Sequence, residues 1–587
     1  MPEYLAPGVY VEETSFRAKS IEGVGTSTTA FVGPTRKGPY RVDDDTPESP
    51  ELLTSYGDFE RIYGGFADLS LGDGVPGTNY LAHAVRAFFN EGGSRLYVSR
   101  VVGADPEVAA VEIIGGAQEG VSITARFPGA AGNGRVVVRE ASTPASETTL
   151  ANAPAGSLVR ATLAGNPALL VRVGNSWRPA ANLEGDAVAQ ADVLAGTPQL
   201  ITVSVLTIDG DGNSLSFEDM GLANTHPRWI GHVMSVTPSR RSDHLQNFYA
   251  INVGSDVSPS ELHAGLFNGA ANNAAGQPER VWTLTGGEDG GEPTSTNYAL
   301  ALAEIASLED VSIVAAPGSS AYGVDDGDNP QAIASALIAH AEGRRAYRIA
   351  VLDTPPELLP TTARTYRGLF DSKYGAMYFP WVVVSNPLAR PGREDIPKEI
   401  ALPPSGFVSG IYARNDVQRG VHKAPANEVV RGALRFEIDV NFAQQEMLNP
   451  AGVNCLRFFS GRGNRVWGAR LISSDPEWKY VSDRRYFNYL EASIDRSTQW
   501  AVFEPNGERL WANIRQTIAD FLYNEWRSGA LLGASPDEAF FVRCDRSTMT
   551  QNDLDNGRLI CLIGVAIIKP AEFVIFRIGQ KTADARE

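Results

Sequence analysis

The sequence contains 587 residues, of which 43% are hydrophobic and 20% charged, as in ordinary globular proteins. Its net charge of −18 disfavours general binding to nucleic acid, which requires a surplus of Lys and Arg. The sequence shows no run of 18 apolar residues, no secretory signal pattern and no Cys-x-x-Cys pair. We therefore expect no membrane insertion, neither a zinc site nor a disulfide framework, and synthesis in a reducing cytoplasm.

Residues 1–25 are predicted to form an extended N-terminal arm. Val9, Tyr10 and Val11 favour a strand, and an apolar strand at the end of a chain needs a sheet to join. Residues 26–103 are predicted to be the first part of a core. Their pattern indicates a strand at 29–33, a helix capped by Thr78 or Asn79 and ended by Gly92-Gly93, and a second strand at 95–102.

Residues 104–225 have the composition of a β-rich insert that faces outward. Short alternating runs of Val, Ile and Thr are separated by turn residues about every ten positions, which predicts a small sandwich or barrel. Residues 209–213 (DGDGN) resemble the start of a calcium loop, but Ser214 and Met220 stand where Gly and Glu are required. We therefore interpret them as a polar hairpin turn.

The rest of the chain predicts an α/β domain at 226–440, a C-terminal inner domain at 441–570 and a C-terminal linker strand at 571–587. In the α/β domain, helices alternate with near-continuous apolar strands, as in a parallel sheet covered on both faces. The expected helices span 295–308, 330–342 and 363–373, and the expected strands span 311–317, 347–353 and 377–385. The last part is expected to contain a hairpin at 453–473, helices at 483–498 and 508–527, and strands at 539–545, 558–568 and 572–580. The predicted fold class is α/β plus α+β, in several domains. These are an inner domain built from N- and C-terminal parts of the chain, a middle α/β domain and a β-rich inserted domain.

The sequence offers little support for catalysis. Gly33 and Gly38 have the spacing of a phosphate loop, but Pro39-Tyr40 replaces the required Lys and Ser/Thr. There is no HExxH pattern and no GxSxG nucleophile elbow. We therefore predict that the chain is not an enzyme and binds no cofactor or metal.

A more specific pattern lies at residues 402–427 (LPPSGFVSGIYARNDVQRGVHKAPAN). Ser405 is expected to cap a helix that buries Val408, Ile411 and Tyr412. This segment resembles the signature of contractile tail sheath proteins. The opening LAPGVYVEE also resembles the start of these proteins, and further motifs follow in the same order: 284–290 (LTGGEDG), 315–318 (AAPG), 378–381 (YFPW), 463–470 (GNRVWGAR), 480–485 (YVSDRR), 503–506 (FEPN) and 569–573 (KPAEF).

The resemblance implies a structural subunit of a contractile tail sheath. Such sheaths are stacks of six-fold rings around an inner tube, and they contract to drive the tube through a target cell envelope. The implied partners are further copies of the chain, the inner tail tube protein, baseplate and tail terminator proteins, and sister sheath proteins. Neither nucleic acid nor a membrane is expected as a direct partner. The implied location is a virion tail or an injection-system particle that is assembled in the bacterial cytoplasm.

The resemblance also implies roles for particular residues. Sheath subunits donate both terminal arms to a neighbour's inner-domain sheet, which here assigns Val9, Tyr10 and Val11 to one arm and Phe573, Val574, Ile575, Phe576 and Ile578 to the other. Hinges are expected at 21–25 and 568–570. Guanidinium groups suited to a neighbour's carboxylates are expected at Arg419, Arg484 and Arg485. Candidate tube contacts are Arg527, Asn552, Asp553, Asp555 and Arg558.

Alternatives remain open from the residues alone. Each arm could instead complete a sheet of its own domain, and the 548–558 segment could be an ordinary solvated loop. For the whole chain, the alternatives are an α/β enzyme with a β-rich accessory domain, and an adhesion module acting through the insert.

Overall fold

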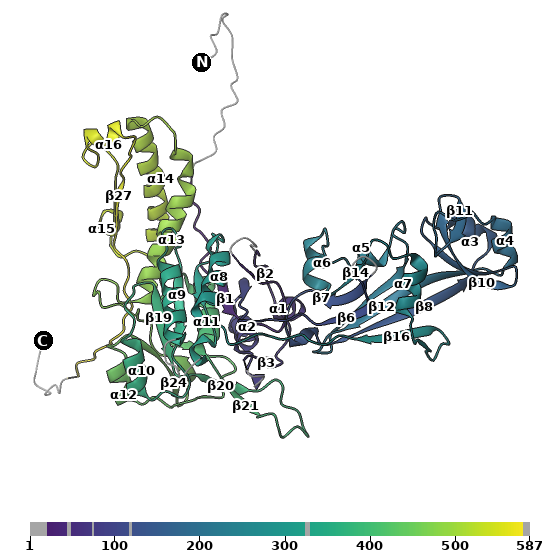
Figure 1. Ribbon diagram of the computed structural model, residues 1–587. Coiled ribbons are helices and arrows are strands. Elements are labelled where there is room, and N and C mark those ends of the chain that lie inside the picture. The colour runs from purple at the N-terminus through teal and green to yellow at the C-terminus, as the bar shows by residue number, and fades with distance from the viewer. Residues whose placement is uncertain (1–19, 44–47, 73–75, 117–119, 323–328, 579–587) are drawn as a thin grey trace, which may run out of the picture.

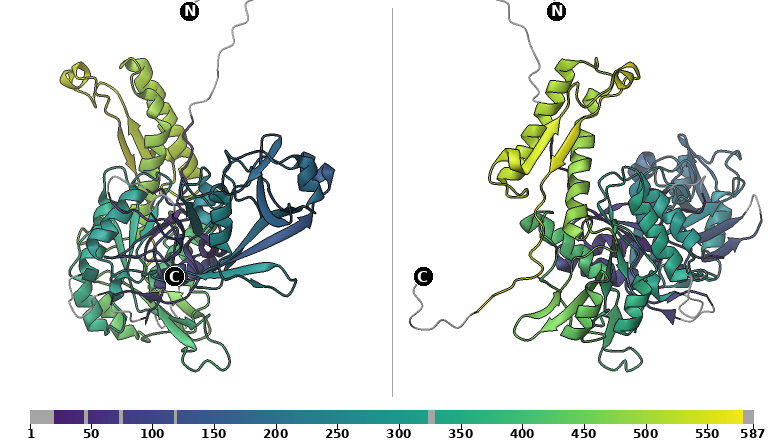
Figure 2. Two further views of the ribbon diagram at one scale, coloured as in Figure 1. Left: turned by 45° about the vertical axis from the view of Figure 1, so that its right-hand side comes forward. Right: turned by 90° about the vertical axis from the view of Figure 1, so that its left-hand side faces the viewer.

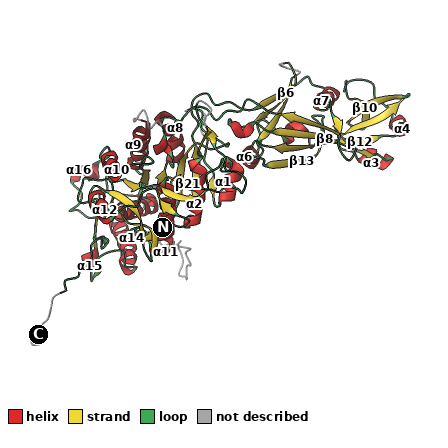
Figure 3. Cartoon of the chain, turned by 90° about the horizontal axis from the view of Figure 1, so that it is seen from below, coloured by secondary structure: helices red, strands yellow, loops and turns green. Residues whose placement is uncertain are grey.

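The computed structural model describes residues 20–43, 48–72, 76–116, 120–322 and 329–578. Three parts stand out in Figure 1: a core of mixed helices and strands, a β-rich insert that projects from it, and a C-terminal subdomain, residues 481–567, that rises beside it. Seen from below in Figure 3, the insert extends the molecule well beyond the core. None of the helices within the described ranges is long and apolar enough to cross a membrane.

The core is built on a nine-stranded sheet to which distant parts of the sequence contribute. The strand order is β2 (Leu52–Leu53), β5 (Leu96–Arg100), β1 (Thr29–Gly33), β17 (Ile313–Ala315), β18 (Ile349–Asp353), β19 (Gly375–Phe379), β24 (Val453–Phe459), β25 (Gly463–Val466) and β22 (Glu428–Val429). The strands from β5 to β24 run parallel, and those at both edges are antiparallel. The predicted hairpin at 453–473 therefore forms as β24 and β25, but it extends the core sheet and not the C-terminal subdomain.

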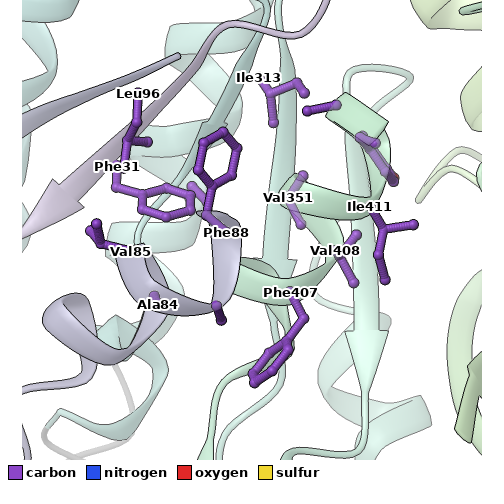
Figure 4. Packing of buried hydrophobic residues seen from close by; sticks show 14 of the residues in the cluster. Phe31, Ala84, Val85, Phe88, Leu96, Ile313, Val351, Phe407, Val408 and Ile411 are labelled. Carbon is purple, nitrogen blue, oxygen red and sulfur yellow. The ribbon is translucent and has the colours of Figure 1, made fainter. Parts of the chain in front are cut away.

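Helices cover both faces of this sheet, as the apolar strands predicted. Because strand residues alternate between faces, Phe31 points to a cluster that includes α2 and α11, whereas Ala30 and Val32 point to one that includes α8 and α9. Figure 4 shows the first cluster. The helices of the core are α1 (Tyr56–Tyr63), α2 (Tyr80–Glu91), α8 (Ser295–Ala306), α9 (Asn329–Glu342), α10 (Pro360–Arg367), α11 (Pro404–Arg419) and α12 (Phe442–Leu448). Asn79 caps α2 as predicted, and Gly92 ends it in the left-handed conformation.

The single strand predicted at 377–385 is divided in two. Strand β19 ends at Phe379, and β20 (Val382–Ser385) begins after Pro380 in a separate sheet with β21 (Glu399–Leu402) and β23 (Arg435–Phe436). Proline has no N–H to donate to a sheet ladder, so the strand leaves the core sheet at this point. A small pair, β3 (Leu69–Ser70) and β4 (Pro76–Gly77), lies at the edge of the core.

The β-rich insert is larger than the sequence predicted, because strands beyond residue 225 pair with strands before it. Strand β14 pairs with β7, and β16 pairs with β8. The strands are β6 (Ala110–Ile114), β7 (Val121–Ala125), β8 (Arg135–Pro144), β9 (Leu158–Leu163), β10 (Asn166–Val173), β11 (Ser176–Pro179), β12 (Gln199–Ile208), β13 (Ser214–Met220), β14 (Tyr249–Val253), β15 (Ala271–Asn272) and β16 (Pro278–Thr283). The helices are α3 (Glu147–Asn152), α4 (Gln190–Ala195), α5 (Ile230–Val233), α6 (Arg241–Gln246) and α7 (Pro259–Leu266).

Buried ion pairs join the insert to the core. The turn between β12 and β13 is the polar hairpin predicted at 209–213, and its carboxylates face cations of the core. Lys37 Nζ lies 2.8 Å from Asp209 Oδ2, and Arg36 Nη2 lies 2.7 Å from Asp211 Oδ1. Since buried charges are stable only when paired, these contacts fix the root of the insert.

The C-terminal subdomain consists of two long helices and a two-stranded sheet. Its elements are α13 (Val481–Ser497), α14 (Glu508–Arg527), α15 (Pro536–Ala539), β26 (Phe540–Arg543), α16 (Gln551–Asp555) and β27 (Leu562–Val565). The helix predicted at 508–527 forms as α14, and its apolar face is buried against α13 and the small sheet. Short 3-10 helices lie at Ala130–Gly132, Ser319–Ala321 and Gln499–Ala501.

Candidate assembly surface

The 402–427 signature builds the core and does not form an exposed site. Gly406 and Gly410 place α11 directly against α2. A Cβ atom at Gly406 would lie 2.7 Å from Ala84 Cα, and one at Gly410 would lie 2.6 Å from the carbonyl oxygen of Phe88. Only glycine permits so close an approach of two helices.

Ser405 does not cap α11 as predicted, because the helix begins one residue earlier and Pro403 occupies the cap position. The Ser405 backbone N and Oγ instead donate to the two oxygens of Asp353, at 2.7 and 2.5 Å. Complete burial raises the pKa of Asp353 to about 7, although the two hydrogen bonds from Ser405 oppose the shift. The serine of the signature thus satisfies a carboxyl group at the end of β18.

Arg484 and Arg485, which were expected to contact a neighbouring subunit, have partners in their own chain. Arg485 Nη2 lies 2.6 Å from Asp416 Oδ2, and both side chains are 3% exposed. Arg484 donates to Asn488 and Glu491, each at 2.8 Å, and its guanidinium lies over the ring of Trp478. These buried guanidinium groups already have their carboxylate and amide partners. Arg419 is exposed at the end of α11 and stays a candidate subunit contact.

The described chain begins as a segment bound to α13 and to the end of α11. Val24 N donates to Ser493 Oγ at 3.1 Å, Thr26 Oγ1 donates to Asp416 at 2.6 Å, and Ile21 packs on the apolar cluster of the C-terminal subdomain. The hinge predicted at 21–25 is therefore held in place in this structure. Val9, Tyr10 and Val11 lie outside the described residues.

The C-terminal segment forms no strand within its described part, which ends at residue 578. Its apolar side chains project into solvent, with exposed fractions from 67% to 96%: Phe573, Val574, Ile575, Phe576 and Ile578. We refer to residues 573–578 as the C-terminal arm. Alternation along an extended chain would place Phe573 and Ile575 on one face and the other three on the opposite face. Both faces are thus apolar, as in a strand that is covered on both sides.

A carboxylate clamp fixes the root of this arm. Glu572 accepts hydrogen bonds from Arg470 at 2.7 and 2.8 Å, from Asn449 at 2.8 Å and from the Tyr480 hydroxyl at 2.8 Å, and Lys479 Nζ lies 3.2 Å away. Burial alone would raise the pKa of Glu572, but the hydrogen bonds from Arg470, Asn449 and Tyr480 outweigh it and lower the pKa to about 2. Glu572 is therefore ionised at neutral pH and bound to the start of α13.

The sheet of β26 and β27 is incomplete by itself. Among the described residues it contains two strands, with α14 packed against one face. On the other face, Phe541 and Leu562 are about half exposed. A two-stranded sheet is marginally stable in water, and an open edge with apolar neighbours is a template for a further strand.

The candidate tube contacts do not form one patch. Asn552, Asp555 and Arg558 are exposed on the loop that contains α16. Asp553 lies in the capping box of α16, where its carboxylate accepts a hydrogen bond from the cap residue Thr550 and its backbone N donates to Thr550 Oγ1. The Arg558 carbonyl accepts a hydrogen bond from Asn506, just before α14 begins. Arg527 is the last residue of α14, which at 20 residues is about 30 Å long, so it lies at the opposite end of the subdomain.

The clamp was not predicted from the sequence. Arg470, Tyr480 and Glu572 lie in motifs that support the resemblance, at 463–470, 480–485 and 569–573, but spacing alone gives no reason to pair them. Asn449 and Lys479 lie outside these motifs. No group of three or more His, Cys, Asp or Glu side chains in the described ranges could hold a metal ion.

Comparison with known proteins agrees with this architecture. The phage tail sheath protein central domain matches residues 291–470, and the phage tail sheath C-terminal domain matches residues 473–581. A prophage major tail sheath protein of Pseudomonas aeruginosa is 26% identical over 272 residues, which are 45% of this chain and 64% of that protein. The tail sheath protein of Enterobacteria phage T4 is 23% identical over 177 residues, which are 30% of this chain and 26% of that protein. The matched regions thus span less than two thirds of either relative.

Two solved structures share the fold over most of the chain. The helical sheath of the anti-feeding prophage in its contracted state gives a TM-score of 0.52 at 21% identity and covers 99% of this chain and 100% of that chain. The sheath tail protein from Listeria innocua gives a TM-score of 0.53 at 12% identity and covers 94% of this chain and 97% of that chain. At these identities the likeness establishes the fold alone.

The fold is therefore the mixed α/β, multidomain fold that the sequence predicted. The two domain matches place residues 291–581 in the phage tail sheath protein family, and the relatives are tail sheath proteins too.

Proposed function

We propose that this chain is a structural subunit of a contractile sheath, in a phage tail or an injection-system particle, and that its copies join by exchanging terminal arms. The observation that carries the proposal is the C-terminal arm, which exposes five large apolar side chains beyond a fixed root. A segment of this kind is unfavourable in water and needs a sheet to cover it.

The arm is directed away from its own chain's open sheet. Ile567 still pairs with Leu531 beside that sheet, and five residues later Glu572 is bound to Arg470. Figure 2 (right) shows the chain leading away from β26 and β27 beyond this point. To pair with its own sheet, the arm would have to reverse direction within the clamp. A sheet of another copy is open to it without that rearrangement.

The wider sheath function rests on the family. In the proposed particle, copies of the chain stack as six-fold rings around an inner tube, and baseplate, terminator and sister sheath proteins are further partners. Contraction would be a repacking of subunits whose arms stay connected, with no nucleotide required. The loop of α16 and Arg527 are the proposed tube-facing candidates, and Arg419 is a proposed subunit contact.

Truncation tests the exchange of arms. We expect that deleting residues 573–587, or residues 1–20, leaves a soluble folded subunit that forms no tubes in electron microscopy. Deleting residues 579–587 alone retains the arm and serves as the matched control, which should assemble like the full chain. Tubular assemblies from either long truncation would contradict arm exchange. Failure of the full chain itself to assemble, with or without a tube protein, would contradict the sheath function.

A further inference from the structure

Two cysteines lie opposite each other at the base of the α16 loop. Strands β26 and β27 are antiparallel, and Arg543 pairs with Leu562 at the last position of the ladder. One step further, the same register places Cys544 directly opposite Cys561. Because 16 residues separate the two cysteines in the sequence, their spacing does not predict that they pair, but the fold makes the two cysteines neighbours.

The position of this pair in the ladder brings the two side chains close together. Ala566 N donates to the Ala539 carbonyl at 2.7 Å, so this facing pair is hydrogen-bonded. In antiparallel sheets such pairs alternate with non-hydrogen-bonded ones, and five steps along the ladder lead to a non-hydrogen-bonded position for Cys544 and Cys561. Facing Cα atoms at such positions are about 4.5 Å apart, within the range of about 4.4–6.8 Å that a disulfide spans.

The two thiols differ in access to solvent. Cys544 is fully buried against α14, whereas Cys561 is half-buried. Burial raises the pKa of Cys561 to about 12, and the neighbouring Cys544 adds to the shift. Burial also raises the pKa of Cys544, against the hydrogen bond from Cys561. Arg515 of α14 lowers both pKa values, and Asp545 raises that of Cys544.

We propose that Cys544 and Cys561 are a redox pair, and that a small-molecule disulfide oxidises them to a disulfide that closes the loop 545–560. The accessible Cys561 loses its proton and attacks the small disulfide, so that one sulfur of the reagent stays bound and the other leaves as a thiolate that takes up a proton. Cys544 then loses its proton and attacks Cys561 Sγ in this mixed disulfide. The second reagent thiol leaves, and two protein thiols have been oxidised while one small disulfide has been reduced to two thiols.

The closed loop carries α16 together with Asn552, Asp555 and Arg558, so oxidation fixes the base of the segment that bears most of the candidate tube contacts. In a reducing cytoplasm the pair stays as thiols, and after release of a particle into oxidising surroundings the disulfide persists. The thiol–disulfide exchange belongs to the chain itself, whereas its consequence for tube contacts and for a released particle rests on the proposed sheath function.

The test uses the purified full-length protein and oxidised glutathione at pH 7, 8 and 9, followed by alkylation and mass spectrometry of peptides without reduction. We expect a peptide linked through Cys544 and Cys561 that dithiothreitol separates. Its rate of formation should rise about tenfold per pH unit, because only the thiolate attacks and the pKa of Cys561 lies above this range. Hydrogen exchange of residues 545–560 should be slower in the oxidised protein.

Variants separate the two steps. Cys544→Ser should stop at a glutathione adduct on Cys561, and the matched control Cys455→Ser, which removes a buried thiol of β24, should still form the linked peptide. In the wild-type protein, a persistent adduct on Cys561 without closure, or no reaction at any of the three pH values, would overturn the proposal. If residues 545–560 exchange hydrogen equally fast in the reduced and the oxidised protein, the disulfide does not fix the loop.

Discussion

The carboxylate clamp at the root of the C-terminal arm can be tested by removing one charge. In Glu572→Gln the side chain keeps its shape, but the ion pairs with Arg470 and Lys479 are lost. We expect the root to open more often, because Arg470 then keeps a half-buried charge without a carboxylate partner.

The magnitude follows from the titration of Glu572. A pKa lowered from 4.5 to about 2 corresponds to an upper bound of about 3 kcal/mol, at about 1.36 kcal/mol per unit. The side chain is 19% exposed, so solvent screening reduces this value, and we expect about 2 kcal/mol. Because the folded-state pKa lies below the unfolded value, this contribution is complete above pH 4.5 and is lost as the pH falls toward 2.

Hydrogen exchange measured by mass spectrometry at pH 7 reports this local opening without requiring two-state unfolding of the whole chain. A loss of about 2 kcal/mol predicts exchange that is roughly 30-fold faster in the peptides covering residues 567–573 and 468–482. The matched control is Glu477→Gln, which neutralises an exposed carboxylate in the same region. If both variants exchange like the wild type, the clamp does not hold the arm.

Two further predictions concern the core. Gly410→Ala should cost about 1–3 kcal/mol of stability and lower the temperature of the first thermal transition, because its Cβ atom would lie 2.6 Å from a backbone oxygen of α2. In the control variant Gly25→Ala the Cβ atom would meet open space, so the transition temperature should stay unchanged. Equal transition temperatures for the two variants would contradict the close packing of α11 on α2. The pKa of Asp353, raised to about 7, means that its contribution to stability is full below pH 3.8 and is lost as the pH rises through 7. In thermal scans, Asp353→Asn should therefore be less stable than the wild type at pH 5, and the difference in stability should be smaller at pH 8. A stability difference that does not change with pH would refute the assigned titration of Asp353.

Much of the core could be predicted from the sequence because its signals are local. Helices α8 and α9 begin and end close to the predicted residues, and apolar runs identified β17 and β18 as covered strands of a parallel sheet. The insert was predicted to end at residue 225, whereas its strands β14 and β16 lie beyond that position. Their pairing with β7 and β8 is a long-range contact that no local pattern contains.

The candidate site was predicted less completely. The apolar C-terminal arm was visible as a predicted strand at 572–580, but its clamp joins residues more than 90 positions apart. Arg484 and Arg485 were expected to bind a neighbour's carboxylates because the planar guanidinium group suits them, yet in the structure they are buried partners of Glu491 and Asp416. For a charged residue near the start of a helix, the sequence alone does not predict whether its ion-pair partner lies in the same chain or in another copy.

The magnitudes separate what the arm and its clamp would contribute to the proposed assembly. Burying five large apolar side chains at about 1.5–3 kcal/mol each amounts to about 10 kcal/mol, several times the value of the clamp. The arm would therefore provide the affinity and the clamp its direction. Yet joining two free subunits costs about 4–15 kcal/mol in lost freedom, so one arm alone comes close to no net gain. In the proposed assembly a second, N-terminal arm would add to the first, so removal of either one should be enough to prevent assembly.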